Sequence, residues 1–476
     1  MERLRISPSG RYRKEHDLLG DKDVPVEALF GVQTLRCIEN FDISRDYLSE
    51  YPEFTKALGI VKMGAVLANH QLGLIDDNVK DAIVKACQEL MDGMHLEHFP
   101  IDMVQGGAGT SVNMNANEVI ANRALEIMGK ERGQYQFCSP NDHVNMAQST
   151  NDAYPSAMHI GLYLTHFQVR EALEKLIQSF RNKEEEFANI IKMGRTQLQD
   201  AVPMTLGQSF GAYASAMTHE LQRLEIAAKE FLYINMGATA IGTGITAEPG
   251  YAEACIKYIR EITGWDIKLS DNLIEATHDT SCMVAYASAL KMIAIRMSKI
   301  CNDLRLLSSG PRTGIAEISL PPKQPGSSIM PGKVNPVIPE VVNQVCFKVI
   351  GNELTVCLAS EAAQLELNVM EPVMVQSIVQ SSDWLIRAFD TLRIECIDGI
   401  KANPDHCKHM VEHSIGIVTA LKPFIGYSKS TEIAKEALET GGSVYQLVVE
   451  KGLLTKEQLD TIMDPKHMIK PTKIKL

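Results

Sequence analysis

Apolar residues recur every three or four positions through much of the chain, which is the spacing of one face of an α-helix. In residues 54–72 four apolar positions follow this spacing, namely Leu58, Val61, Ala65 and Ala68. Residues 77–91 and 113–128 show similar helical patterns, and glycine-rich loops interrupt them. We therefore predict an N-terminal domain of short helices and loops over residues 1–145.

From about residue 146 the predicted helices become much longer. The longest helical stretches are residues 151–193, 203–235, 271–309, 339–371 and 373–397. The third contains neither Gly nor Pro, and it carries a heptad seam formed by Met283, Tyr286, Leu290, Ile293, Met297, Ile300, Leu304 and Leu307. Other apolar residues lie off the seam, so this helix is expected to be buried in a bundle.

The pattern therefore predicts a mainly α protein with a central long-helix bundle over residues 146–398. A small C-terminal helical domain is expected over residues 399–476, where the patterns become short again. At 1.5 Å per residue the central helices would each be about 35–60 Å long, which exceeds the diameter of a compact domain. We expect the bundle to continue into a shared oligomer core, with an extended monomeric bundle as the alternative.

Composition and charge narrow the possible functions. The net charge of −12 argues against nucleic-acid binding, because phosphate contacts need a clustered excess of Lys and Arg. The longest apolar runs are interrupted by charge, as by Lys291 and Arg296, so no membrane span is expected. The ten cysteines are scattered without a CxxC pair, and the chain start lacks the apolar stretch of a signal peptide. These features predict a reduced, cytoplasmic protein.

Four stretches rich in hydroxyl and amide groups are predicted to be loops or helix starts. They are residues 109–113, 148–152, 194–200 and 326–336. The last holds two glycines and two prolines and cannot lie inside a helix. Its N–H groups, two hydroxyls and one lysine suit a compact anion whose charge grows during reaction. Apolar Ile329, Met330 and Val334 lie between these polar residues, which favours a shaped loop over a flexible linker.

Together these four stretches resemble the aspartase/fumarase superfamily, and the resemblance covers nearly the whole chain. The sequence GSSIMPGKVNP at residues 326–336 is similar to the superfamily signature at every position. Two further motifs resemble the aspartase branch more than the fumarases, namely Gly107-Ala108-Gly109-Thr110-Ser111 and Ser149-Thr150-Asn151. The resemblance implies a three-domain, mainly α fold and a homotetramer whose long helices form a multi-helix core.

The resemblance also implies a reaction, the reversible anti elimination of ammonia from L-aspartate to give fumarate through an aci-carboxylate intermediate. Ser327 is then expected to be the general base. The substrate-binding residues that it implies are Thr110, Ser149, Thr150, Asn151, Thr196, Gln197, Ser328, Lys333 and Asn335, with Glu340 in a supporting role. Lys333 and Asn335, helped by Thr196, are expected to hold the α-carboxylate.

Gln197 departs from the histidine that is common at this position in fumarases. Asn151 and Gln197 are expected to meet the amino group of the substrate, but a glutamine cannot carry a proton at neutral pH. The group that protonates the leaving amine therefore stays open. No cofactor or metal is expected, with Mg²⁺ possible only as an activator. One set with metal-like spacing is interpreted as a solvated helix face, namely His406, Cys407, His409 and His413.

Two alternatives stay open. The nearest is a fumarate hydratase, which would add water to fumarate without any reaction that depends on ammonia. The second is a catalytically silent helical scaffold with the same fold, against which Ser327, Lys333 and Asn335 are all retained. Because long helices separate the four loops, we expect active sites built from loops of more than one subunit.

Overall fold

The computed structural model describes residues 9–464, 467 and 474. The first eight residues, on which the expectation about a signal peptide partly rests, lie outside this range. The chain divides into two compact units. One contains the residues up to 170 together with 222–292 and 348–384, and the other contains residues 171–221, 293–347 and those from 385 onward. The division into three domains stays a prediction.

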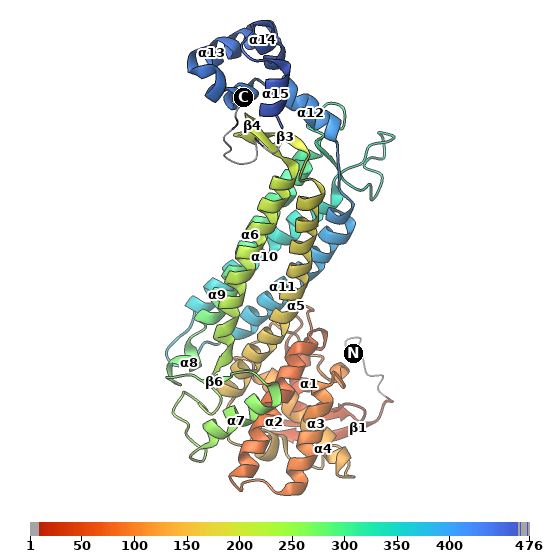
Figure 1. The fold of residues 1–476 in the computed structure, drawn as a ribbon. Coiled ribbons are helices and arrows are strands. Elements are labelled where there is room, and N and C mark those ends of the chain that lie inside the picture. The colour runs from red at the N-terminus through yellow and green to blue at the C-terminus, as the bar shows by residue number, and fades with distance from the viewer. Residues whose placement is uncertain (1–8, 465–466, 468–473, 475–476) are drawn as a thin grey trace. The chain divides into compact units, whose positions relative to one another are not determined.

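The first unit begins with an antiparallel hairpin of β1 (Tyr12–Asp17) and β2 (Gly20–Pro25). Its shorter α-helices are α1 (Val32–Asn40), α2 (Pro52–Gln71), α3 (Asp77–Met91), α4 (Thr110–Ile127), α7 (Tyr251–Thr263) and α8 (Glu275–His278). Helix α2 packs against α3 and α7 (Figure 1). The predicted helices at 54–72 and 77–91 are confirmed, and the one at 113–128 begins three residues earlier, at Thr110.

Five long helices contribute residues to both units. They are α5 (Thr150–Glu186), α6 (Leu206–Ala228), α9 (Ser281–Leu307), α10 (Val337–Glu361) and α11 (Glu371–Glu395). The predicted seam on α9 is confirmed, because all eight of its residues are buried. Ile295, off the seam, is 43% exposed, so not every apolar face of α9 is covered within the chain.

The predicted ends of the long helices are wrong in several places. Helix α5 ends at Glu186, because residues Ile191–Thr196 form strand β3 and pair with β4 (Gln199–Thr205). Because residues 203–205 belong to β4, the helix that was predicted at 203–235 begins later, at Leu206. Helix α9 begins only at Ser281, after the short helix α8, and α10 ends at Glu361.

The β3–β4 hairpin belongs to the second unit, where it lies beside the C-terminal helices (Figure 1). These are α12 (Pro404–His413), α13 (Val418–Thr440), α14 (Val444–Glu450) and α15 (Lys456–Ile462), and strands β7 (Ile318–Ser319) and β8 (Lys401–Ala402) form a second short pair. Met193 of β3 joins their core. On α12, His406, His409 and His413 are exposed as predicted, whereas Cys407 is buried and its thiol donates to the Glu317 carbonyl.

Helix α10 is, among the described residues, the one helix long and apolar enough to cross a membrane by length and composition alone. Its polar side chains bond to neighbouring helices, as Asn343 does to Ser298 at 2.9 Å and Glu353 to Lys291 at 2.5 Å. These bonds are those of a helix packed inside a protein bundle. One face of α10 stays open, however, with Phe347, Leu354 and Leu358 each about 60% exposed.

All ten cysteines are free thiols, and eight of them are buried. Burial raises the pKa of every one of these thiols above its ordinary value. The eight buried side chains therefore behave as small apolar groups in the interior.

Candidate active site

Thr110 is the first residue of α4, and the glycine before it shapes this start. Gly109 has φ of +84°, and a Cβ there would lie 2.5 Å from the ring of Tyr154. Both the left-handed backbone and the close aromatic ring therefore require glycine. The Thr110 hydroxyl donates to the Gly107 carbonyl at 2.7 Å, so it must rotate before it can donate to a substrate.

The motif Ser149-Thr150-Asn151 forms the start of α5. Asn113, on α4, donates to the Thr150 hydroxyl oxygen at 3.3 Å, so the hydrogen of that hydroxyl is left to donate elsewhere. The Asn151 amide nitrogen donates to the Ala240 carbonyl at 2.7 Å. No described residue donates to its amide oxygen, which is the kind of acceptor that a substrate ammonium group needs. In the first unit, therefore, Asn113 links the helix of Thr110 to the Ser149–Asn151 motif.

In the second unit Thr196 and Gln197 lie at the exposed tip of the β3–β4 hairpin. Thr196 pairs with Gln199, so the turn between the strands has two residues, Gln197 and Leu198, with φ of 54° and 61°. Two left-handed residues are the requirement of a type I′ turn, which ordinarily selects Asn-Gly. Residues with larger side chains are strained there, by about 1 kcal/mol each, and such strain is frequent at functional sites.

The loop at residues 326–336 is closed by its own hydrogen bonds. The Gly326 N–H donates to the Lys333 carbonyl at 2.7 Å, and the Asn335 amide donates to the Gly326 carbonyl at 2.8 Å. A Cβ on Gly326 would lie 2.7 Å from the Lys333 carbonyl oxygen, so this closure requires glycine. The prediction of a shaped loop is confirmed, although Ile329, Met330 and Val334 are exposed in this chain.

Ser327 has the environment expected of an activated hydroxyl. Its Oγ accepts hydrogen bonds from the backbone N–H groups of Ile329 at 3.2 Å and Met330 at 3.0 Å. Two N–H dipoles directed at one oxygen favour its anionic form. Ser328 and Lys333 of the same loop are exposed, and Glu340 lies in the first turn of α10.

The sequence-predicted residues thus form two groups. Thr110 and the Ser149–Asn151 motif belong to the first unit, whereas Thr196, Gln197, the 326–336 loop and Glu340 belong to the second. Within the second unit, no hydrogen bond or ion pair between described residues joins the hairpin tip to the loop. A single chain therefore presents two separately built groups of polar residues.

Comparisons with known proteins agree with these features. Residues 20–351 match the family model described as Lyase, and residues 417–470 match the model Fumarase C C-terminus. The chain belongs to the lyase family.

Individual relatives cover almost the full length of this lyase. The aspartate ammonia-lyase of Helicobacter pylori is 55% identical over 459 residues, which is 96% of this chain and 98% of the relative. A solved structure of fumarate lyase:delta crystallin from Brucella melitensis has a TM-score of 0.94 at 51% identity, and it covers 97% and 100% of the two chains. Class II fumarase from Schistosoma mansoni, at the same coverage, has a TM-score of 0.89 but only 33% identity. The mainly helical aspartase/fumarase fold is confirmed.

The structure adds Lys62, which sequence reasoning missed. Its side chain is fully buried in α2, and its Nζ donates to three amide oxygens: Asn113 at 2.6 Å, Gln148 at 2.7 Å and Asn145 at 3.1 Å. Burial lowers the pKa of this lysine to about 7. By occupying the amide oxygen of Asn113, Lys62 directs the amide nitrogen toward Thr150. The sequence did carry a signal for Lys62. This charged residue lies one turn after Leu58, on the apolar face of the predicted helix.

Asp152 supports the same region of the lyase. Its carboxylate accepts N–H groups of Ser149 at 2.9 Å and of Gly237 and Thr239 at 3.0 Å. Burial raises the pKa of this carboxyl to about 6, against the lowering effect of those N–H groups and of Lys62. The aspartate therefore ties the start of α5 to the loop whose Ala240 carbonyl holds Asn151.

Glu317 supports the other group and was also missed. Its carboxylate has no exposed surface, and it lies 2.8 Å from Lys192 Nζ and 2.5 Å from Arg195 Nη1. Both cations belong to β3, the strand that ends at Thr196. On the other strand, the Ser414 hydroxyl donates to Asp200 at 2.7 Å. Both strands of the hairpin are thus fixed to the body of the second unit.

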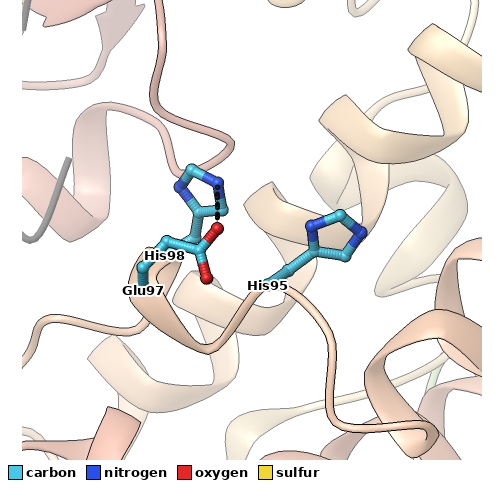
Figure 2. Close-up of side chains that lie close together, drawn as sticks. All are labelled: His95, Glu97 and His98. Atoms are coloured by element: carbon cyan, nitrogen blue, oxygen red, sulfur yellow. Dashed lines mark ion pairs between the residues drawn. The ribbon is translucent and has the colours of Figure 1, made fainter. Parts of the chain in front are cut away.

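One further polar cluster has the composition of a metal site but not its hydrogen-bond pattern. His95, Glu97 and His98 have potential ligand atoms within 4.8 Å of one another (Figure 2). The Leu29 N–H donates to His98 Nδ1 at 3.3 Å, so the hydrogen of the neutral ring is on Nε2, which faces Glu97 at 3.5 Å. Burial lowers the pKa of His98 to about 4, which keeps the ring neutral. A metal ion binds a histidine nitrogen through its lone pair, and the Nε2 of His98 carries a hydrogen in that position.

Proposed function

We propose that this lyase catalyses the reversible elimination of ammonia from L-aspartate to give fumarate. Curated relatives at 51–55% identity over nearly the whole chain are aspartate ammonia-lyases. The single structural observation that carries the proposal is the Ser327 hydroxyl, which receives two backbone N–H groups inside a closed loop. The reaction needs a base of this kind.

The chemical difficulty of the reaction explains the donor-rich loops. The proton to be removed sits on the carbon beside a carboxylate, and its removal places a second negative charge on that group. Preorganised donors are the largest catalytic contribution available for such a dianion, and one donor is typically worth about 3–4 kcal/mol. We assign this role to the hydroxyls of Thr110, Ser149, Thr150 and Ser328.

Ser327 acts as the base in its alkoxide form. Each unit by which its pKa is lowered requires about 1.4 kcal/mol of preferential stabilisation of the anion. The N–H groups of Ile329 and Met330 supply part of this, and the cation of nearby Lys333 adds to it. Lys333 and Asn335, with Thr196, hold the α-carboxylate of the substrate.

The amino group is bound by Asn151 and Gln197, both through amide oxygens. The free oxygen of Asn151 supports this orientation, because an ammonium group can only donate. The amine leaves as ammonia or ammonium without receiving a proton from Gln197. The mechanism uses no cofactor and no metal in the site, and Mg²⁺ is at most an activator.

We further propose a homotetramer whose active sites combine loops of several subunits. The open face of α10, with Phe347, Leu354 and Leu358 exposed, supports this assembly, since a contiguous apolar face on a globular protein ordinarily covers a partner. The ten free thiols, eight of them buried, are in keeping with a reducing cytoplasm.

One paired assay tests the activity. Purified protein is given fumarate with ammonia, and separately fumarate alone, and the fall in fumarate absorbance is followed. We expect consumption only with ammonia, and the matching rise in fumarate from L-aspartate. Consumption of fumarate in water alone would instead select a fumarate hydratase, and no change in either direction would select the silent scaffold.

A further inference from the structure

An acidic cavity of about 300 Å³ lies in the first unit, apart from the residues assigned to the reaction. It is bounded by α5, α8 and the first turns of α9 and α11. Five carboxylates line it, and no lysine or arginine does; the five are Glu230, Asp271, Glu275, Asp279 and Glu371. Within the described part of the chain none of the five forms an ion pair. A cavity lined by a single sign of charge concentrates ions of the opposite sign.

Glu371 is the most unusual of these groups. It is the first residue of α11 and only 4% exposed, yet no described residue donates a hydrogen bond to its carboxyl. Burial raises the pKa of this carboxyl to about 8. Buried carboxyls are ordinarily paired or hydrogen-bonded, so an unpartnered one on a cavity wall indicates a missing partner.

The thiol of Cys282 shows that several of these charges converge. Burial, followed by the charges of Asp279, Glu230 and Glu371, raises its pKa to about 12. His159 does not compensate them. Its Nδ1 donates to the Tyr233 carbonyl at 2.7 Å, and its Nε2 lies 3.3 Å from the Cys282 sulfur. Burial lowers the pKa of His159, which favours the neutral ring.

The spacing of the carboxylates decides which kind of cation fits. Among the described residues, the one set of three potential metal ligands within 4.8 Å of one another is the cluster of Figure 2, which lies elsewhere. No three of the five cavity carboxylates, all of which belong to the described part of the chain, lie that close together. Apolar residues also line the cavity, among them Pro155, Met158 and Met283. This lining matches a chain of methylene groups with a charge at each end.

We propose that this cavity binds a linear aliphatic diamine in its diammonium form, with Glu371 pairing one of the two ammonium groups. Binding should release a proton. In the empty cavity at pH 7 the Glu371 carboxyl is mostly protonated, and a neighbouring ammonium stabilises its carboxylate form. Up to about 0.9 proton is therefore released for each ligand bound.

Calorimetric titration of the assembled protein with 1,4-diaminobutane at pH 7 tests this, in two buffers that differ in ionisation enthalpy. We expect one ligand per chain and a binding heat that differs between the buffers. The Glu371→Gln variant should fold, because glutamine resembles the protonated acid, but it should bind at least tenfold more weakly and lose the buffer dependence. Glu366→Gln, an exposed neighbour outside the cavity, is the matched control and should behave like the wild type.

Further ligands and a second variant sharpen the result. 1-Aminobutane should bind at least tenfold more weakly than the diamine, and Glu275→Gln should weaken the diamine if Glu371→Gln does not fold. The proposal is overturned by the absence of saturable diamine binding, as when a partner subunit fills the cavity. Diamine binding of undiminished affinity in the Glu371→Gln variant would also overturn it. So would magnesium chloride that binds to the wild type with proton release when the diamine does not bind.

Discussion

Replacing Glu317 by glutamine tests whether the buried carboxylate positions the hairpin that carries Thr196 and Gln197. The variant keeps the shape of the side chain but leaves the side chains of Lys192 and Arg195, 7% and 17% exposed, without their anion. Breaking a buried ion pair by removing one partner costs about 3–5 kcal/mol. The opening equilibrium of the hairpin should therefore rise by roughly 10²-fold to several thousandfold.

Hydrogen exchange of the peptide that covers the hairpin measures this opening directly, without assuming that a chain with two units unfolds in one step. Glu395→Gln is a matched control in the same unit, because its ion pair with Lys323 is 44% exposed on the glutamate side. Removing an exposed partner costs about 0–1 kcal/mol. Unchanged exchange of the hairpin in Glu317→Gln would refute the structural part of the reasoning.

The functional part is read from a double-mutant cycle with Gln197→Ala, using kcat/KM for L-aspartate. If Glu317 acts through the hairpin tip, the two substitutions are strongly non-additive, because the second removes a contact that the first has already misplaced. Additive losses would show that Glu317 affects activity by another route.

Three further predictions concern single side chains. Ser327→Ala should lower kcat by about 10³-fold or more while the elution volume of the assembly stays unchanged, and near-normal turnover would remove serine from the role of base. In the wild type, thermal stability should rise between about pH 7 and pH 10.5, because in that range Lys62 is protonated in the unfolded chain but has lost its proton in the folded one, where its pKa is lowered. Lys62→Met should abolish this rise, and a rise that persists in the variant would assign it to another group. Gln197→His should introduce an ionisation near pH 6.5 into the pH profile of kcat, and a profile identical to that of the wild type would show that this side chain does not reach the leaving group.

Helix periodicity was sufficient to predict α2, α3 and the buried seam of α9, because each is determined by local spacing of apolar residues. It failed at residues 191–205, where Met193 and Pro203 pair as neighbouring strands. Gly194 carried a usable signal, since a Cβ there would lie 2.8 Å from the Val202 carbonyl, and a glycine inside a strand often marks such a close approach.

The candidate site likewise contains some residues that the sequence could predict and others that it could not. Ser327 and Thr150 stand in short motifs whose chemistry is visible from neighbouring residues. Lys62, Glu317 and Glu371 were not predicted as functional, because a lone lysine or glutamate in a helix or loop is ordinarily solvated. Their meaning depends on distant segments, such as the amides at 113, 145 and 148 for Lys62, and these meet only in the folded chain.

The burial of eight of the ten native thiols has a practical consequence for following the movement of the hairpin. A thiolate is the form that reacts with maleimides, and burial keeps the native cysteines protonated. Leu198 at the turn is 70% exposed, so a cysteine placed there would be more accessible than the eight buried native thiols, and the two partly exposed ones, Cys282 and Cys357, are the native cysteines to replace first. A fluorophore at that position would report when the tip becomes covered, on substrate addition or on assembly of the subunits.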